Sequence, residues 1–295
     1  MSKKTGLIDI HTAVLLFGLA GLFGKWLPLS PLFIVLGRVF FASLALALIL
    51  LISRQGFAIT PSKTYLILLF LGFMLSVHWV SFFQSIQVSS VAIGLLSYST
   101  FPVFTTFLEP LFFRERLVKI NVLFSLLCLF GVLLIIPSFH IDNATFRGVL
   151  WGLLAGFTFS ILTIFNRKLT QKLSPLSIAF FQDFFATIFL CPFLFLLKPS
   201  LSSRDILLLI ILGTVCTAGS HTLFIKGMRH IKAQTASIIS SLEPVYGILF
   251  AFLFLNEIPS LRTTAGGCVI LVSQILIFIK IFSLDHSNKI LMTRE

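Results

Sequence analysis

The chain has 295 residues, of which 57% are hydrophobic and only 11% are charged. Soluble domains carry about 25% charged residues, so this sequence lacks the polar side chains that would cover a water-exposed globule. The same apolar content excludes a disordered chain. The formal net charge of +12 therefore has to be interpreted from where the basic residues lie, and it does not by itself indicate nucleic-acid binding.

Ten apolar segments follow one another along the chain. In order they are Ile10–Leu27, Pro31–Ser53, Tyr65–Ser85, Val91–Phe113, Ile120–Ile136, Gly148–Asn166, Leu176–Leu197, Ile206–Ile225, Thr235–Leu255 and Leu261–Phe282. Each is close to the roughly 20 residues that a helix needs to cross a bilayer. Backbone amides in lipid need partners within their own segment, which favours helices, and continuous apolar runs do not fit the strands of a membrane β-barrel. We therefore expect an all-α integral membrane protein with ten transmembrane helices.

The basic residues predict how these spans are oriented. With the N-terminus in the cytoplasm, sixteen of the 22 Lys and Arg residues fall in cytoplasmic segments and five fall outside, while Arg38 lies within a span. The positive-inside rule then places both termini in the cytoplasm. Short connections and the lack of an organelle signal make the bacterial inner (plasma) membrane the expected location. The four cysteines fall in four different spans without metal-ligand spacing, so we predict no metal site and no cofactor.

Three sequence matches in the same order indicate an internal duplication. They are L-S-P-L at 29–32 and 173–176, Pro followed thirteen residues later by Glu at 102–115 and 244–257, and L-A-G at 19–21 and 154–156. We predict two five-helix repeats, 1–143 and 144–295. Because five is odd, the two copies enter the membrane from opposite sides, and such inverted repeats are typical of alternating-access carriers with a midplane site.

The blocks that end the fourth and ninth spans read F-P-V-F-T-T-F-L-E-P-L-F-F-R-E-R-L and L-E-P-V-Y-G-I-L-F-A-F-L-F-L-N-E-I-P. With two five-span halves, cytoplasmic termini and Arg38 in G-R-V-F-F-A, the chain resembles the EamA-type transporters of the drug/metabolite transporter superfamily from Ile10 to Phe282. The resemblance implies the fold and the transport of a small organic metabolite. Members carry amino acids, drugs, nucleotide-like metabolites and other solutes, so the motifs do not indicate the substrate.

Ionisable and ring side chains inside the spans are the candidates for a substrate site, because such groups are costly in lipid. His78 and Trp79 lie well inside the third span, and the repeat offset of 142 pairs Trp79 with His221 in the eighth. We predict that they face each other across a central cavity, where their rings stack on or hydrogen-bond a substrate. The alternative for each histidine is a buried side chain that donates to a neighbouring group.

The ninth span holds a candidate cation or proton site. Ser240, Glu243 and Tyr246 share one helical face, and Pro244 frees a backbone carbonyl beside them. The alternative for Glu243 is an ion pair with Arg38 or a lysine. Tyr98 precedes the equivalent proline in the fourth span, which lacks the carboxylate, so the site would be chemically asymmetric.

The second and seventh spans add three further candidates. Gln182 occupies the repeat position of Arg38, and Asp183 follows it. Asp183 is expected to pair with Arg38 across the halves or to face a lysine nearer the cytoplasm. Arg38 and Gln182 are predicted to bind substrate, with packing, pairing or snorkelling as alternatives for Arg38. The candidates for coupling to an ion are Glu243, His78 and Asp183.

Other span residues are predicted to be structural. Glu109 should pair locally with Arg114 or Arg116, and Glu115 and Glu257 should favour the N-terminus of the helix that follows each of them. Glycines on the first span and the G-x-x-x-G pair on the sixth should allow close packing of each helix within its own half.

The leading hypothesis is a secondary transporter that works by alternating access at a midplane cavity between the halves. Proton coupling, exchange and facilitated diffusion all stay open. The sequence has no nucleotide-binding loop and none of the H-E-x-x-H or G-x-S-x-G motifs, which disfavours a primary pump and an enzyme. The alternatives are a membrane-embedded lipid-handling protein and a non-transporting scaffold. The expected partners are a small-molecule substrate and the lipid bilayer, not nucleic acid, with the chain as a monomer or homodimer.

Overall fold

The computed structural model describes residues 3–54, 63–113, 117, 119–197 and 200–292, and every regular element in these ranges is a helix. The helices are α1 Lys3–Ala20, α2 Phe23–Trp26, α3 Pro31–Ile52, α4 Lys63–Val88, α5 Val91–Tyr98, α6 Phe101–Phe113, α7 Lys119–Ile135, α8 Ala144–Leu169, α9 Pro175–Leu190, α10 Pro192–Leu197, α11 Ser203–Gly213, the π-helix η1 Thr214–Gly219, α12 Ser220–Gly227, α13 Ala233–Ser240, α14 Glu243–Leu255 and α15 Leu261–Met292.

Seven helical segments in these ranges are long and apolar enough to cross a membrane. They are Lys4–Trp26, Pro31–Ile52, Lys63–Val88, Val91–Phe113, Ala144–Leu169, Pro175–Leu196 and Ser203–Gly227. The fifth, ninth and tenth predicted spans coincide with shorter apolar helices, Val122–Ile135, Glu243–Leu255 and Leu261–Leu276. The prediction of an all-helical membrane protein is confirmed, whereas the count of ten spans and their inverted arrangement stay predictions.

The ninth predicted span is short because its helix is interrupted. α13 ends at Ser240 and α14 begins at Glu243. Pro244 is the second residue of α14, and without a backbone N–H it cannot continue the hydrogen-bond ladder of α13. The fourth predicted span is interrupted in the same way, between α5 and α6, where Pro102 is the second residue of α6. The two repeated proline blocks therefore mark corresponding breaks.

The repeated L-S-P-L sequence also has a local structural reason. Ser30 and Ser174 are the N-caps of α3 and α9, and their hydroxyl oxygens accept hydrogen bonds from the backbone N–H groups of Phe33 at 3.4 Å and Ser177 at 3.0 Å. The proline after each serine opens the helix, where the missing N–H costs nothing and the fixed φ suits the first turn. Each copy of the motif therefore starts a helix.

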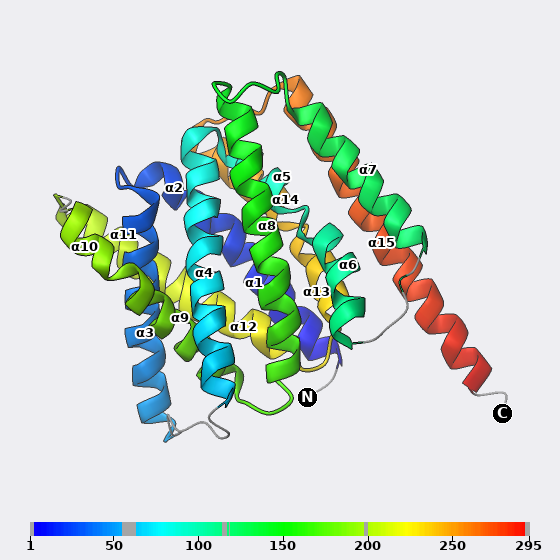
Figure 1. Cartoon of the computed structure of the whole chain (residues 1–295), viewed down its shortest axis with the longest axis horizontal. Coiled ribbons are helices and arrows are strands. Elements are labelled where there is room, and N and C mark those ends of the chain that lie inside the picture. Colours follow the sequence, from blue (N-terminus) through cyan, green and yellow to red (C-terminus); the bar gives the residue numbers. More distant parts are fainter. Residues whose placement is uncertain (1–2, 55–62, 114–116, 118, 198–199, 293–295) are drawn as a thin grey trace.

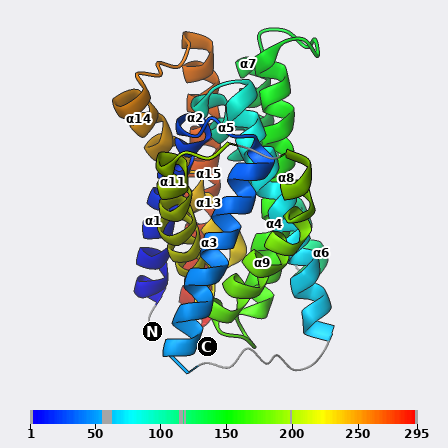
Figure 2. The same ribbon diagram turned by 90° about the vertical axis from the view of Figure 1, so that its left-hand side faces the viewer.

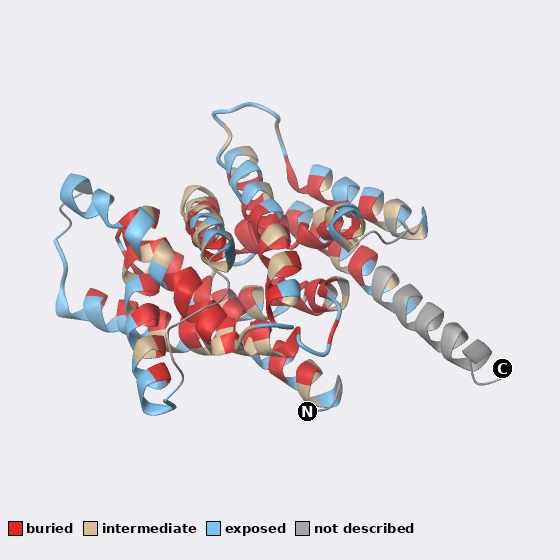
Figure 3. Cartoon of the chain, turned by 60° about the horizontal axis from the view of Figure 1, so that its bottom comes forward, coloured by how far each residue is buried: buried red, intermediate tan, exposed pale blue. Residues whose placement is uncertain are grey.

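The helices form one bundle with a helix pair at its edge. The main hydrophobic core is built largely from α1, α3, α4, α8, α9 and α12, and a second cluster involves α7 and α15. Figure 1 shows these two helices side by side along one edge. α1 begins and α15 ends toward the same end of the bundle (Figures 1 and 2). Buried residues fill the middle (Figure 3), and many outward-facing residues are large and apolar, as lipid contact requires.

Glycines hold α1 and α8 against the opposite half of the chain. Gly18 lies against Tyr246 of α14, and α1 also packs on α12 and α13. Gly156 lies against the backbone of Tyr98 and Phe101, and α8 packs on α4, α5 and α6. The prediction that each helix packs within its own half is therefore wrong. The missing side chains allow each helix to approach the broken helix of the other half closely.

Glu257 contacts a different helix from the one that its position in the sequence suggests. It follows Asn256, which ends α14 in the left-handed conformation. Its carboxylate accepts hydrogen bonds from the backbone N–H groups of Val91 and Ala92, both at 3.2 Å. Glu257 therefore caps the N-terminus of α5 in the other half, where a negative charge is favourable, and not the N-terminus of α15 that follows it.

Glu109 forms an ion pair between the halves of the chain. One carboxylate oxygen lies 2.6 Å from the guanidinium of Arg167 on α8. The predicted local partners Arg114 and Arg116 lie outside the described residues, as does Glu115. The contact with Arg167 adds a long-range partner that we did not expect, and the local pair stays a prediction.

The packing of α8 on α5 can be tested with a single methyl group. A Cβ at Gly156 would lie 2.9 Å from the carbonyl oxygen of Tyr98, which is backbone and cannot move aside. We expect Gly156→Ala to destabilise the protein by about 1–3 kcal/mol, as overpacking does. The same change at Gly219 places a Cβ 3.6 Å from its nearest neighbour and should be tolerated. Thermal unfolding of the two variants in detergent compares them, and equal melting temperatures would contradict the packing.

Candidate functional site

Seven buried polar or charged side chains interact with one another in the middle of the bundle. They are Arg38 of α3, His78 and Trp79 of α4, Tyr98 of α5, Asp183 of α9, His221 of α12 and Glu243 of α14. Each is at most 3% exposed. We call this set the central cluster. Both halves of the chain contribute to it, and all seven residues are among the candidates that the sequence predicts.

Arg38 is held by neutral groups rather than by a carboxylate. Its Nε donates to the hydroxyl of Thr217 at 2.9 Å, and its Nη2 donates to the carbonyl oxygen of Cys216 at 3.4 Å. Its Cζ lies 3.4 Å from the ring centroid of Trp79, in a cation–π contact. The remaining nitrogen, Nη1, is buried without a hydrogen-bond partner. Arg38 is fully buried, so it does not snorkel toward the membrane surface.

The π-helix η1 positions the two neutral partners of Arg38. Thr217 donates its hydroxyl to the carbonyl oxygen of Leu212, five residues earlier, at 2.7 Å. π-helical turns are frequent at functional sites because they displace one residue out of the regular helix. Sequence reasoning missed Thr217 and Cys216. The signal available was a short run of small residues between Gly213 and Gly219, within an otherwise apolar span.

His78 has one nitrogen occupied and one free. Nδ1 lies 2.9 Å from the carbonyl oxygen of Ala155 on α8. A carbonyl only accepts, so Nδ1 carries the hydrogen, while Nε2 is buried without a partner. The ring lies among those of Trp79, Tyr98 and Phe159, at centroid distances of 4.5, 5.4 and 5.0 Å. The backbone contact matches the alternative that the sequence left open, and it leaves one nitrogen for a ligand.

Asp183 lies closest to a histidine. Its Oδ2 is 3.8 Å from Nδ1 of His221, beyond hydrogen-bond length, and neither carboxylate oxygen has a hydrogen-bond partner. Asp183 also interacts electrostatically with Arg38, and His221 does so with His78. The expected contact between Asp183 and Arg38 is therefore a longer-range interaction, and His221 joins the cluster through Asp183.

Glu243 is the first residue of α14, where the free N–H groups of the helix favour a carboxylate. The hydroxyl of Tyr98 donates a hydrogen bond to it, and Arg38 interacts with it electrostatically. Its Oε2 is buried without a partner. The contact between Tyr98 and Glu243 joins the two interrupted helices, so the breaks in both halves meet at the central cluster.

Three other predicted site residues make different contacts. Ser240 donates to a carbonyl oxygen of its own helix at 3.0 Å, and the interruption after it ends the continuous helical face that it was expected to share with Glu243. Tyr246 lies against α1 at Gly18. Gln182 donates its Nε2 to Asn166 on α8 at 2.6 Å, and its Oε1 is buried without a partner. Sequence reasoning did not identify Asn166.

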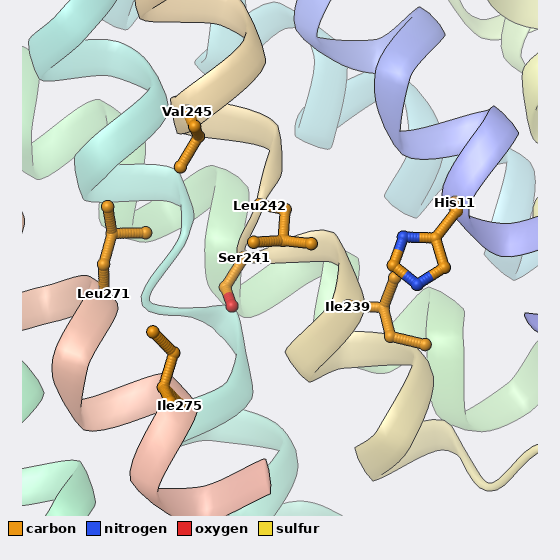
Figure 4. A pocket seen from close by; sticks show the side chains of 7 residues that line it. All are labelled: His11, Ile239, Ser241, Leu242, Val245, Leu271 and Ile275. Atoms are coloured by element: carbon orange, nitrogen blue, oxygen red, sulfur yellow. The ribbon is translucent and has the colours of Figure 1, made fainter.

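An apolar groove runs along α15, apart from the central cluster. One cavity of about 360 Å³ is lined by His11, Ile239, Ser241, Leu242, Val245, Leu271 and Ile275 (Figure 4). A second, of about 390 Å³, shares Val245 and Leu271 with it. Neither is lined by a residue of the central cluster, and few lining groups are polar. No group of three or more potential metal ligands occurs in the described part of the chain. The central cluster is therefore the better candidate for binding a polar solute.

Among the described contacts, Arg38 is the only cation that interacts with both Asp183 and Glu243. Its removal should therefore lower the free energy of unfolding. We expect Arg38→Ala to destabilise the protein by about 3–5 kcal/mol, because it leaves the two buried carboxylates without a cation. Arg38→Lys should cost less, since it keeps the charge but loses the planar stacking on Trp79. Denaturation in detergent measures both, with the exposed Arg204→Ala as control; an unchanged Arg38→Ala protein would contradict this role.

Comparison with known proteins identifies a family and several relatives. The EamA-like transporter family matches residues 4–136 and 146–279. The uncharacterized transporter YxxF of Bacillus subtilis is 28% identical over 94% of this chain and 91% of its own length. The S-adenosylmethionine uptake transporter of Rickettsia conorii is 24% identical over 76% and 73%, and the pseudopaline exporter CntI of Pseudomonas aeruginosa is 25% identical over 80% and 84%.

A solved crystal structure shares the fold. It superposes with a TM-score of 0.72 at 16% sequence identity and covers 96% of this chain and 99% of its own. The family match spans nearly the whole chain, and the helices are apolar and long enough for a membrane. The chain therefore belongs to the EamA-like transporter family of integral membrane proteins.

Proposed function

We propose that this protein is a secondary transporter that moves a small organic solute by alternating access, with the central cluster as the binding site between two inverted five-helix halves. The observation that carries the proposal is a buried charged cluster to which both halves contribute and in which several polar atoms have no partner. Ionisable groups at this depth are costly and mark transport pathways.

The packing of the helices supports two related halves. α1 packs on α12 and on α14, and α8 packs on α4 and on α6, which are the same contacts with the halves exchanged. α3 packs on α11, and α9 packs on α4, in the same relation. The contact of α5 with α14 corresponds to that of α6 with α13, and two pairs of helices in equivalent positions also pack on each other, α3 on α9 and α7 on α15. This pattern supports a pseudo-twofold axis that relates the two halves.

The two interrupted helices support a site at the central cluster. In carriers built from inverted repeats, corresponding helix breaks point to the substrate site, because half-helix ends face the ligand. Here Tyr98 ends α5, Glu243 begins α14, and the two side chains touch. Tyr98 lies four residues before Pro102, and Glu243 directly precedes Pro244.

The names of the relatives support transport of a small organic solute, but they differ in the direction of transport. The name of one states uptake of S-adenosylmethionine, and the name of another states export of pseudopaline. We place the chain in a bacterial inner membrane with both termini in the cytoplasm, as the distribution of basic residues indicates.

Contacts between the halves occur at both ends of the bundle, as an occluded state requires. Lys226 of α12 pairs with Asp9 of α1 at 3.1 Å, and Arg167 pairs with Glu109, toward the end where α1 begins. At the opposite end Glu257 caps α5. Alternating access would break the contacts at one end at a time.

Transport itself is tested with purified protein in liposomes, a panel of metabolites, and an imposed or absent pH gradient. We expect at least one solute to be moved, and Glu243→Gln to reduce its transport or the pH dependence of transport while expression stays normal. Turnover of a lipid without movement of any solute would favour the lipid-handling alternative and overturn the proposal.

The cap formed by Glu257 predicts a gate. Loss of a helix cap costs about 0.5–2 kcal/mol, so Glu257→Ala should shift the protein toward the state that is open at this end. Ile93 is buried beside Glu257 in a cavity of about 260 Å³, and a cysteine introduced there should react faster with a membrane-impermeant maleimide in the Glu257→Ala background. Asp142→Asn, an exposed carboxylate at the same end, is the control. Equal labelling rates would show that Glu257 is not part of a gate.

A further inference from the structure

Resting on the proposed function, we infer that the transported solute carries a protonated amine, which Asp183 and Glu243 hold in the central cluster. The proposal names the chemical class of the solute, which neither the family nor the relatives determine for this chain. It follows from the charges of the cluster, from the contacts that Arg38 makes, and from the inventory of buried atoms without partners.

The formal charge of the central cluster is unbalanced. Besides its two histidines, it holds one positive group, Arg38, and two negative groups, Asp183 and Glu243. All three are almost fully buried, and their electrostatic interactions place them in one cluster. An uncompensated charge in a low-dielectric interior is strongly unfavourable. One further positive charge would therefore balance these three groups.

Arg38 does not use its hydrogen bonds on the carboxylates. A purely structural ion pair would bring its guanidinium within 4 Å of a carboxylate, often through two parallel hydrogen bonds. Instead Arg38 donates to a hydroxyl and a carbonyl, Thr217 and Cys216. Both oxygens of Asp183 and one oxygen of Glu243 are left without a hydrogen bond. Besides the contact of Asp183 with His221 at 3.8 Å and that of Glu243 with Tyr98, these oxygens are available to a ligand.

The unpartnered atoms of the cluster and its surroundings are mostly acceptors. The acceptors are Oδ1 and Oδ2 of Asp183, Oε2 of Glu243, Nε2 of His78 and Oε1 of Gln182. The donors are Nη1 of Arg38 and Nε1 of Trp79, and Nδ1 of His221 is a further atom without a partner, which donates or accepts according to the tautomer. A buried polar atom without a partner costs about 1–3 kcal/mol, so a ligand that fills this site should bring several donors. A protonated amine provides three donors and the missing positive charge together.

The aromatic wall of the cluster suits the same group. The rings of Tyr98 and Phe159 lie 5.4 Å apart, and His78 lies within 5.4 Å of both. Aromatic faces attract cations, most strongly where water is excluded. The face of the Trp79 ring is already covered by the guanidinium of Arg38. Bare protonation of a carboxylate would also neutralise the cluster, so the test has to separate a bound proton from a bound amine.

Proteoliposomes that contain the protein are incubated with a small-molecule extract of bacterial cells, and the transported solutes are identified by mass spectrometry. We expect the transported solutes to carry a protonated amine. For each one, the N-acetyl derivative, which keeps the skeleton but loses the charge, should compete at least about tenfold more weakly, the loss expected for one hydrogen bond to a charged group. Transported solutes without an amine, or N-acetyl derivatives that compete equally, would overturn the inference and leave the proposed function intact.

Variants then assign the amine to the carboxylates. Asp183→Asn should weaken the binding of the amine-bearing solute by at least about tenfold. Asp183→Glu keeps the carboxylate and should keep the preference for the amine over its N-acetyl derivative. The control Asp142→Asn, at an exposed position, should behave as wild type. If Asp183→Asn and Glu243→Gln alter only the pH dependence and not amine binding, the carboxylates hold a proton and the inference fails. If no solute is transported, the proposed function fails, and the inference fails with it.

Discussion

The rest of the structure depends on burying three charges, Arg38, Asp183 and Glu243, inside a helical bundle in lipid. Each charge is costly there, and the helices around it are arranged to reduce that cost. A π-helical turn presents Thr217 and Cys216 to the guanidinium, Trp79 lies over it, and Glu243 begins α14. The close approach of α1 and α8 to the broken helices, through glycine, keeps this region closed to solvent. The local irregularities of the fold thus lie where the charges are.

Much of the architecture follows from sequence rules that act over short distances. Apolar length predicts the helices, and the L-S-P-L motifs start helices because serine caps and proline suits the first turn. Proline likewise predicts the breaks before Pro102 and Pro244. The seven residues of the central cluster could all be selected, because a polar group inside an apolar span is conspicuous. The repeat offset then indicates that residues of both halves belong together.

What the sequence could not predict depends on contacts between the halves. Periodicity does not say that α8 crosses to α4 and α5, so the helices that Gly156 and Glu257 contact were assigned wrongly, and the contact of Glu109 with Arg167 was not foreseen. Thr217 and Asn166 were missed because a threonine or asparagine in a span is ordinary until a charged or amide side chain is seen to contact it. The sequence allows Asp183 to pair with Arg38, whereas in the structure both carboxylate oxygens of Asp183 lack hydrogen bonds.

We expect the solute to bind among Arg38, Asp183 and Glu243, between the two halves. A structure of the protein with its transported solute bound would locate the solute directly. The solute should then give density at the central cluster, with one of its donors within about 3.2 Å of an oxygen of Asp183 or Glu243. A solute seated instead in the apolar groove along α15, with the central cluster unchanged, would contradict this expectation.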